Sequence, residues 1–259
     1  RGSSHGRTRI IRRAYFEDPV YVPLVDRAYA LWDALAEEVG ETLLLRTGGL
    51  MIGRPDGVLV GGALRSAREH GLAHEILDAD ALHRRYRALQ PAADMVGVFE
   101  PEAGVLFPEA CIAAHLRLAR RRGADLRVGS EVLGWSGDAT GITVNTADGE
   151  HHADQLLIAA GAWLPRLVPA LAAQFRVERQ LLYWFDAFDD AAQFAPARCP
   201  IHLWEWAPQR FFYGFPDLGE GVKLAVHHEG ETVHPDAARR PPDAAEIAAI
   251  RALAERFVP

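Results

Sequence analysis

Apolar residues recur at helical spacing in several segments of the chain. Between residues 20 and 38 they lie three or four positions apart, at Leu24, Ala28, Leu31 and Leu35. This spacing predicts an amphipathic helix that follows Pro23. Similar patterns predict helices over residues 58–70, 80–89, 108–122 and 243–257. Asp78 or Asp80 is expected to cap the helix at residues 80–89. Glu109 lies in the first turn of the helix at residues 108–122, where the helix dipole favours a carboxylate.

Short apolar or alternating runs predict strands between the helices. The expected strands are residues 42–45, 49–52, 95–99, 125–128, 131–135, 141–145, 151–158, 180–188, 201–206, 210–215 and 222–228. Residues 156–161 form a continuous apolar run that ends in small residues just before a helix expected to begin at Ala162. Such a strand-to-helix turn can bind an anion or a nucleotide, although a plain turn is at least as common. The pattern predicts an α/β chain with two interleaved domains.

The composition is that of an ordinary globular protein. The 259 residues carry a net charge of −7, and 49% are hydrophobic. The longest run without polar side chains, residues 156–164, is half of the roughly 18 residues that a membrane span needs. The acidic balance argues against nucleic acid as the main partner, and Cys111 and Cys199 are too few for a disulfide scaffold. We therefore expect a cytoplasmic protein without a membrane or nucleic-acid partner.

Lys223 is the only lysine, so 27 of the 28 basic residues are arginine. A position that keeps lysine can need a compact ammonium that is able to lose its proton when buried, which a guanidinium cannot do. Chance is an equally good explanation before the surroundings of Lys223 are considered.

Other candidate features each have two interpretations. If residues 9–12 are helical, Arg9 and Arg12 lie on one face and converge on an anion; a solvated basic turn is the alternative. The aromatic residues between positions 184 and 213 can line a pocket or fill an ordinary core. On a strand, His227 and His228 point to opposite faces, so we expect no metal site there.

The segment SHGRTRIIRRAY, residues 4–15, resembles the family of monomeric sarcosine oxidase and N-methyltryptophan oxidase. These are flavoprotein amine oxidases of the D-amino-acid-oxidase-like superfamily. Further similar motifs follow in the same order along the chain: TGGL at 47–50, FEP at 99–101, GVLF at 104–107, GAW at 161–163, YGFP at 213–216 and VKL at 222–224 with His227. The similarity extends over nearly the whole chain.

The resemblance implies a role for each matching residue. It makes Arg12 the group that binds the substrate carboxylate, and Tyr213 and His227 the pocket residues that contact the substrate. It aligns Lys223 with the lysine near flavin N5 that activates oxygen. It also implies contacts with FAD, from His5, Thr8, Arg9, Val132, Gly161, Ala162 and Trp163. No metal ligands are expected.

The fold that the resemblance implies is α/β, or α+β. A partial Rossmann-like FAD-binding domain, residues 1–43 and 107–176, is expected to interleave with a substrate domain that contains a mixed or antiparallel sheet, residues 44–106 and 177–259. The family's glycine-rich opening strand and the cysteine that carries covalent flavin are not found in this sequence. Neither Cys111 nor Cys199 matches the linking position, so the flavin linkage stays open. We therefore expect an internal piece of a longer protein.

The implied activity is oxidation of N-methylated or secondary α-amino acids, such as sarcosine, with FAD as cofactor and O2 as the second substrate. The products would be an imine and hydrogen peroxide, and a monomer is expected. Two alternatives stay open: a flavin-dependent amino-acid dehydrogenase of the same fold, and an inactive chain that binds no cofactor.

Overall fold

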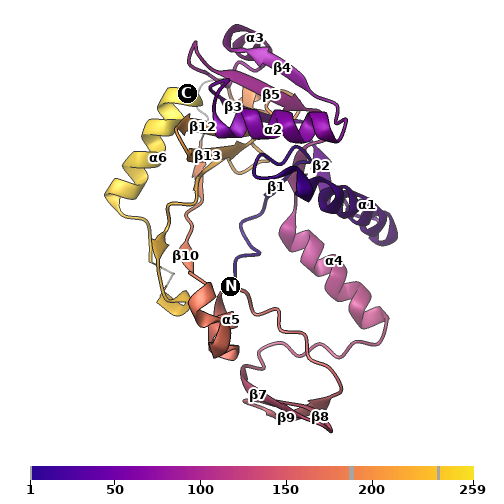
Figure 1. Cartoon of the computed structure of the whole chain (residues 1–259). Coiled ribbons are helices and arrows are strands. Elements are labelled where there is room, and N and C mark those ends of the chain that lie inside the picture. Colours follow the sequence, from indigo (N-terminus) through magenta and orange to yellow (C-terminus); the bar gives the residue numbers. More distant parts are fainter. Residues whose placement is uncertain (1, 187–189, 238–239) are drawn as a thin grey trace.

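The structure is a computed structural model that describes residues 2–186, 190–237 and 240–259 (Figure 1). Its α-helices are α1 (Val22–Val39), α2 (Val58–Glu69), α3 (Ala79–Arg85), α4 (Pro108–Arg121), α5 (Leu164–Leu167) and α6 (Ala244–Phe257). Short 3-10 helices cover Pro19–Tyr21, Gly161–Trp163, Pro169–Gln174, Ala191–Phe194 and Pro235–Ala237. The five helices expected from apolar periodicity are therefore confirmed, within a few residues at each end.

Local capping explains where two of the helices begin. Asp78 accepts a hydrogen bond from the Ala81 amide at the start of α3. At α6, Asp243 and Glu246 form a capping box, in which each side chain binds the backbone N–H of the other residue. The buried stripe of α1 differs from the expected one, because Leu24 and Leu31 are 68% and 52% exposed. The buried residues of the helix are Val22, Tyr29 and Leu35, and the Tyr29 hydroxyl donates to the Glu102 carbonyl at 2.9 Å.

A seven-stranded mixed sheet forms the centre of the molecule. Its strand order is β11 (Tyr183–Phe185), β14 (Val222–His227), β13 (Arg210–Phe215), β12 (Ile201–Ala207), β3 (Gly49–Gly53), β5 (Val96–Glu100) and β4 (Glu75–Asp78). The pair β12–β3 is parallel, and the other pairs are antiparallel. The parallel pair joins an early and a late part of the chain in one sheet.

Smaller sheets lie around this centre. An antiparallel sheet contains β1 (Arg9–Ile11), β6 (Gly104–Leu106) and β2 (Leu44–Arg46), in that order. A separate meander contains β7 (Val132–Asp138), β8 (Gly141–Thr146) and β9 (Gly149–Ala153), at the opposite end of the molecule from α3 and β4 (Figure 1). The short strands β10 (Glu178–Arg179) and β15 (Glu231–Thr232) pair with each other. The expected α/β class with mixed and antiparallel sheets is confirmed.

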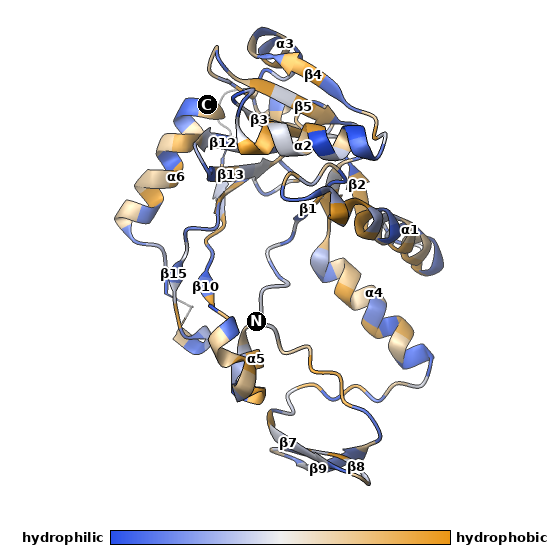
Figure 2. Ribbon diagram, in the orientation of Figure 1, coloured by the Kyte–Doolittle hydropathy of each residue, from blue (hydrophilic) through white to orange (hydrophobic). Residues whose placement is uncertain are grey.

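The two faces of the central sheet have different surroundings. On one face Trp204 and Phe212 stack at 5.6 Å and pack against Phe257 of α6. Helices α4 and α6 show alternating hydrophobic and hydrophilic bands, as expected for helices that bury one side (Figure 2). For Trp204 and Phe212 the core interpretation is therefore correct. Phe211 and Tyr213 alternate with them and lie on the other face, with Lys223.

Two predictions about strands are wrong. Residues 125–128 form no strand, and neither do residues 156–161, where Leu157 is 90% exposed. A buried strand needs neighbours that bind its backbone, and no strand in the described part of the chain pairs with residues 156–161. The sequence analysis also missed the short strands β4, β6, β10 and β15. The end of the strand expected at 180–188 includes Phe188, which lies outside the described residues.

None of the helices among the described residues is both long and apolar enough to cross a bilayer.

Candidate active site

Lys223 lies on β14, and only 2% of the residue is exposed. Its Nζ donates hydrogen bonds to the Gly6 carbonyl at 2.7 Å, the Thr8 carbonyl at 3.0 Å and the Thr8 hydroxyl at 2.9 Å. The rings of Phe215 and Trp184 lie 4.6 Å and 5.5 Å from the same nitrogen. In the described part of the chain no carboxylate forms an ion pair with this ammonium, so backbone and hydroxyl oxygens alone bind it directly.

These surroundings change the acidity of the ammonium. Burial lowers the pKa of Lys223 to about 7, and the positive charge of Arg9 adds to the effect, while the Glu109 carboxylate opposes it. The lone lysine of the sequence is therefore a buried group that exchanges its proton near neutral pH. A guanidinium in this place would stay charged.

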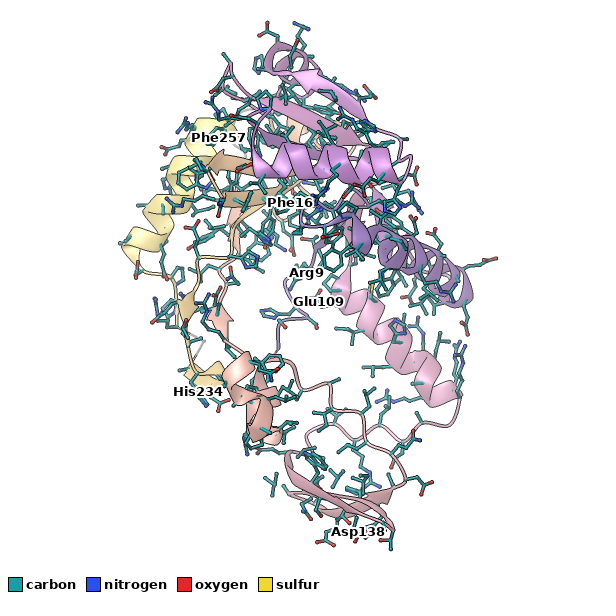
Figure 3. All side chains as sticks on the ribbon, viewed as in Figure 1. Arg9, Phe16, Glu109, Asp138, His234 and Phe257 are labelled. Carbon is teal, nitrogen blue, oxygen red and sulfur yellow. The ribbon has the colours of Figure 1, made fainter. Side chains whose placement is uncertain are left out.

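The segment that precedes β1 wraps around the Arg9 side chain. The guanidinium of Arg9 donates to the carbonyls of Thr8 at 2.8 Å, His5 at 2.6 Å and Ser3 at 2.5 Å. Glu109, in the first turn of α4, lies close to Arg9 beneath the central sheet (Figure 3). Five donors on one planar group allow Arg9 to fix several carbonyls at once. This segment is consequently held in one conformation beside Lys223.

A second group of side chains surrounds Arg12, which is buried. Its guanidinium donates to the Ala14 carbonyl at 3.1 Å and to both carboxylate oxygens of Glu17, at 3.2 and 3.3 Å. It also lies over the rings of Tyr15 at 4.2 Å and Phe16 at 5.2 Å. Arg12 therefore sits in an aromatic environment, with Glu17 as its ion-pair partner.

His227 connects this group to β14. It is four residues from Lys223 and on the same face of the strand. Its ring lies 6.0 Å from the Tyr213 ring and 6.4 Å from the Phe211 ring, and Phe211 in turn contacts Phe16 at 5.2 Å. The face of the sheet thus carries the Lys223 ammonium at one position and the His227 imidazole at another. The imidazole has the Tyr213 phenol as a neighbour and feels the charge of Arg12.

Burial sets the protonation of both ring side chains. It lowers the pKa of His227 to about 4, with smaller contributions from His228 and Arg12 in the same direction and an opposing one from Glu17. Burial raises the pKa of Tyr213, and Arg9 partly opposes that rise. At neutral pH His227 is a neutral imidazole and Tyr213 a neutral phenol, so both can exchange hydrogen bonds with an amine.

Glu100 at the end of β5 positions the backbone next to Arg12. The carboxylate is 2% exposed and accepts hydrogen bonds from the amides of Arg13 at 2.8 Å and Ala14 at 2.9 Å. Burial raises the pKa of Glu100, while these two amides and the charges of Arg12 and Arg13 oppose the rise. The loop that carries Arg12 is therefore fixed to the central sheet.

The structure differs from two expectations about side chains. Residues 9–11 are strand β1 rather than helix, so Arg9 and Arg12 bind separate sets of partners instead of converging on one point. The alternative, a solvated basic turn, does not hold for Arg12 either, because this residue is buried. His228 ends β14 with a left-handed backbone, φ 61°, and its ring lies 4.0 Å from that of His227. A residue in this conformation does not continue the alternation of a strand, so the two imidazoles meet instead of facing apart.

The structure brings most of the predicted site residues together. Those that gather beside the central sheet are Thr8, Arg9, Arg12, Tyr213, Lys223 and His227, with His5 next to Arg9. Trp163 lies next to Gly2 and donates to Asp236 at 2.8 Å, so the Gly161–Trp163 turn lies near the start of the described chain. Val132 begins β7 in the meander and is not brought to this group (Figure 1).

A pocket of about 790 Å³ opens beside the segment that precedes β1. It lies between this segment and the start of α4, and its lining includes His5, Arg7, Phe107 and Glu109. Ligand pockets typically have volumes of this order. A bound group here would lie next to the residues that surround Arg9.

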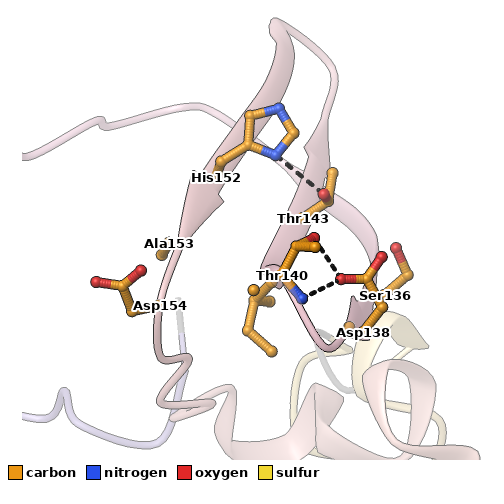
Figure 4. Close-up of a pocket in the computed structure, with 10 residues that line it drawn as sticks. Ser136, Asp138, Thr140, Thr143, His152, Ala153 and Asp154 are labelled. Atoms are coloured by element: carbon orange, nitrogen blue, oxygen red, sulfur yellow. Dashed lines mark hydrogen bonds between the residues drawn. The ribbon is translucent and has the colours of Figure 1, made fainter.

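A different pocket of about 470 Å³ lies in the meander (Figure 4). There Asp138 accepts from the Thr140 amide at 2.7 Å, and the Thr143 hydroxyl lies 3.0 Å from a nitrogen of His152. These side chains are exposed, and the contacts are those of turns and neighbouring strands. No group of three or more possible metal ligands occurs among the described residues. We therefore locate the candidate active site at Lys223.

Sequence reasoning missed several residues of the site. Glu17, Glu100 and Glu109 each bind the segment that carries a predicted site residue, and nothing in their sequence spacing connects them to it. The sequence signal for Glu109 was its place in the first turn of a helix, which explains the helix but not its contact with Gly6. Tertiary contacts alone identify these three carboxylates.

Comparison with protein families places the whole chain in one group. The family described as FAD dependent oxidoreductase matches residues 1–259. The chain is 40% identical over its full length to the monomeric sarcosine oxidase of Streptomyces avermitilis and covers 68% of that protein. It is 37% identical to the N-methyl-L-tryptophan oxidase of Salmonella newport, of which it covers 63%.

Solved structures with a similar fold include NikD, described as an unusual amino acid oxidase essential for nikkomycin biosynthesis. The Tyr258Phe mutant of NikD is similar to the whole chain with a TM-score of 0.81 at 24% identity, and 68% of that structure is covered. Glycine oxidase from Geobacillus kaustophilus gives a TM-score of 0.74 at 19% identity, again with 68% covered.

Proposed function

The chain belongs to the FAD-dependent oxidoreductase family, and from this premise we propose that it carries the active site of an oxidase of N-methylated or secondary α-amino acids. The proposed reaction removes two electrons and two protons from the C–N bond of the amine and reduces O2 to hydrogen peroxide. The resulting imine then reacts with water to give a carbonyl compound and an amine. The observation that carries the proposal is the buried Lys223, held beside Arg9 on the sheet face that also bears Tyr213 and His227.

The residues around Lys223 fit an FAD cofactor. Lys223 and Arg9 provide two cations at one place, since both donate to the Thr8 carbonyl. The pocket of about 790 Å³ is lined by His5, whose carbonyl binds Arg9, and by Glu109. At Gly6, φ is +106°, and a Cβ would lie 2.5 Å from a carbon of Leu182 and 3.3 Å from Arg9, so the backbone approaches these side chains closely. We propose that His5, Thr8, Arg9 and Lys223 hold the flavin ring. FAD would supply the two-electron chemistry of the reaction.

Lys223 is proposed as a catalytic residue in the oxygen half-reaction. A buried cation stabilises negative charge that develops close to it more strongly than a cation in water does. Because the pKa of Lys223 is about 7, the ammonium form is available at neutral and lower pH. Its three hydrogen bonds fix Nζ before oxygen arrives, so little reorganisation is needed.

Arg12 is proposed to bind the substrate carboxylate. Its present anionic partner, Glu17, has a side chain that is 38% exposed, against 8% for Arg12. A substrate carboxylate can replace Glu17 without leaving the buried guanidinium unpaired, which would be costly. The rings of Tyr15 and Phe16 limit the positions that the guanidinium can adopt, and a fixed carboxylate orients the amine end of the substrate.

Tyr213 and His227 are proposed to contact the substrate amine. Both are neutral at pH 7, so they can accept or donate a hydrogen bond without adding charge. A neutral amine has the lone pair that oxidation of the C–N bond requires. Burial favours this form over an ammonium, and so does a hydroxyl such as that of Tyr213 when it donates to the lone pair. This assigns them to the amine end of the substrate.

The expected division into domains supports the same arrangement. We propose that residues 44–106 and 177–259 form the substrate domain, because they supply all seven strands of the central sheet. Residues 1–43 and 107–176 would then contribute to the FAD-binding domain. For Val132, Gly161, Ala162 and Trp163 we propose contacts with parts of FAD distant from the ring.

The test is kinetic and uses the holoenzyme. Peroxide release is measured with sarcosine, N-methyltryptophan, proline analogues and glycine, and rapid mixing separates flavin reduction from reoxidation by air. We expect Lys223→Met to slow reoxidation by O2 by about a hundredfold or more, the loss typical of a removed electrostatic stabiliser, with a much smaller effect on reduction. Arg12→Lys should mainly raise KM.

Four outcomes would contradict the proposal. The intact protein could lack flavin absorbance, or none of the amines could be oxidised, which would exclude the oxidase activity. Equal losses in both half-reactions of Lys223→Met would exclude the role given to Lys223. Slow reoxidation of the wild-type enzyme by air would instead favour a dehydrogenase.

A further inference from the structure

The peptide group between Gly6 and Arg7 is bound at both ends. Its carbonyl, that of Gly6, accepts from Nζ of Lys223 at 2.7 Å, and its N–H, that of Arg7, donates to Oε1 of Glu109 at 3.2 Å. The N–H of Gly6, which belongs to the preceding peptide group, donates to the same oxygen of Glu109 at 2.9 Å. Glu109 belongs to α4 and Lys223 to β14, so one peptide group connects two elements that are distant in sequence.

The conformation of this peptide is unusual. Gly6 has φ +106° and Arg7 has φ 67°, so two successive residues have positive φ. Such a backbone persists when its surroundings hold it in place. Here the surroundings are the two hydrogen bonds to Glu109 on one side and the hydrogen bond from Lys223 on the other.

Few charged groups face Lys223. The elements packed against it contribute Trp184 from β11 and Phe215 from β13, which carry no charge. Arg9 and Lys223 donate to the same carbonyl, that of Thr8, so two cations lie close together. Glu109 is the carboxylate whose charge offsets this repulsion.

Glu109 is charged at neutral pH. Burial alone would raise its pKa, but the amide hydrogen bonds, including those from Arg7 and Gly6, together with the charge of Arg9, leave the pKa of Glu109 below its ordinary value. The helix dipole at the start of α4 acts in the same direction. A fixed negative charge therefore lies one peptide group away from the buried ammonium.

We propose that Glu109 is a positioning residue of the active site, which fixes Lys223 Nζ through the Gly6–Arg7 peptide group and stabilises the positive charge on that ammonium. The inference rests on the role proposed for Lys223. It assigns to a carboxylate of α4 the task of setting both the place and the charge of the group proposed to act on oxygen. A neutral residue at position 109 would leave Arg9 and Lys223 to repel each other without compensation.

The sequence offers a direct test, because Lys223 is the only lysine. Labelling with ¹³C-lysine gives a single Cε signal in the NMR spectrum, and its shift against pH reports the protonation of Lys223 alone. We expect a midpoint near 7 in the wild-type chain. In Glu109→Gln the midpoint should move to lower pH by about one unit, as for the loss of one nearby opposite charge.

Glu220→Gln is the matched control. Glu220 forms an ion pair with Arg7, lies three residues before Lys223 in sequence, and has a side chain that is 41% exposed. Because solvent screens a charge that is so exposed, its loss should leave the midpoint of Lys223 unchanged. Equal midpoints in the wild type and in Glu109→Gln would overturn the proposal, and so would an equal shift in Glu220→Gln.

A second measurement does not depend on how well Glu109→Gln folds. In the wild-type chain we expect the amides of Gly6 and Arg7 to exchange their hydrogens far more slowly than that of exposed Ser4. Glu109→Asp keeps the charge but shortens the side chain, so it should speed this exchange and shift the midpoint of Lys223 less than Glu109→Gln does. Rapid exchange of both amides in the wild type would overturn the proposal.

The two proposals can fail separately. The titration needs neither substrate nor cofactor, so an enzyme that oxidises none of the amines would overturn the oxidase activity and leave the contact between Glu109, Gly6 and Lys223 intact. Conversely, unchanged midpoints in an active oxidase would overturn only the role of Glu109.

Discussion

At the scale of single residues, the site depends on a buried ammonium whose direct ligands are neutral oxygens. Taking a charge out of water is costly unless hydrogen bonds or opposite charges replace the lost solvation. Lys223 has three hydrogen bonds, which stabilise its ammonium form, but burial and repulsion from Arg9 destabilise that form. The net effect of these contributions is a lowered pKa. Such shifts are common at functional sites. The buried ammonium therefore destabilises the folded chain at the position where a reactive cation is proposed to act.

This balance predicts how stability depends on pH. In the unfolded chain Lys223 has the ordinary pKa of 10.5, and in the folded chain about 7. Between these values the unfolded state binds more protons, so the contribution of Lys223 to stability grows as pH rises through this window and is smallest below pH 7. The free energy of unfolding of the wild type, minus that of Lys223→Met, should increase by about 1.4 kcal/mol per pH unit between about pH 7.5 and 10.

Urea unfolding of both proteins at several pH values measures this difference. The comparison with Lys223→Met cancels the titration of Cys111, Cys199 and the tyrosines, which are common to both proteins. A difference that stays constant over this range would show that Lys223 titrates normally in the folded state.

The sequence identified some of these residues and not others, for a physical reason. Lys223 stood out because a chain so rich in arginine kept a single lysine, and Arg12, Tyr213 and His227 matched short motifs of a family. Glu109 and Glu100 act through backbone amides more than 80 residues away in sequence. The local sequence around Glu109 and Glu100 does not indicate which backbone amides they bind in the folded chain.

At the scale of secondary-structure elements, the distinction between local and distant contacts also separates helices from strands. Helices form through contacts between residues three and four positions apart, so the expected helices α1, α2, α3, α4 and α6 are present. A strand depends on its neighbours. The apolar run at 156–161 has the composition of a buried strand, but no described strand pairs with it.

Strand β14 also ends in a way that its sequence does not indicate. His228 and Glu229 both have a left-handed backbone, with φ 61° and 64°. Arg210 binds Glu229 with two hydrogen bonds, of 3.0 and 2.7 Å, and lies 4.3 Å from the centre of the Trp206 ring. This fixed turn places the His228 ring against His227. The element thus sets the environment of a proposed catalytic residue.

Replacing His228 with glycine should distinguish the effect of its backbone strain on stability from the effect of its ring on the pKa of His227. Glycine adopts positive φ without a steric penalty, so His228→Gly should keep or raise the free energy of unfolding, by up to about 1 kcal/mol. Loss of the His228 ring removes part of the burial and the repulsion around His227, whose pKa should rise above about 4. NMR titration of the His227 ring, assigned by comparison with His227→Gln, measures the shift.

Gln209→Gly is the control for this prediction. Gln209 also has positive φ, 58°, in the turn between β12 and β13, but it does not contact His227. It should show a similar change in stability and no change in the titration of His227. If both variants alter that titration equally, the contact between the two imidazoles does not set it.

At the scale of the whole molecule, the site requires distant parts of the chain to meet. Lys223 binds oxygens of residues that lie 215 and 217 positions earlier, and β12 joins β3 in one sheet. The buried clusters come from the residues before 119 and after 193. No residue from 121 to 178 is buried, although this stretch includes all of β7, β8 and β9. Stability is therefore distributed unevenly between the central sheet and the meander.

This uneven burial predicts two levels of hydrogen exchange. Amides of β12 and β13, which lie in the buried core, should exchange only when the whole chain unfolds, whereas those of β7, β8 and β9 should open with a free energy lower by at least about 2 kcal/mol. Trp135 links the meander to α5 through a hydrogen bond from its indole to the Leu167 carbonyl at 2.8 Å. Trp135→Phe should therefore speed exchange in β7, β8 and β9 and leave β12 and β13 unchanged. If all five strands exchange at one rate in the wild type, the meander unfolds together with the central sheet, and the geometry of Lys223 depends on both.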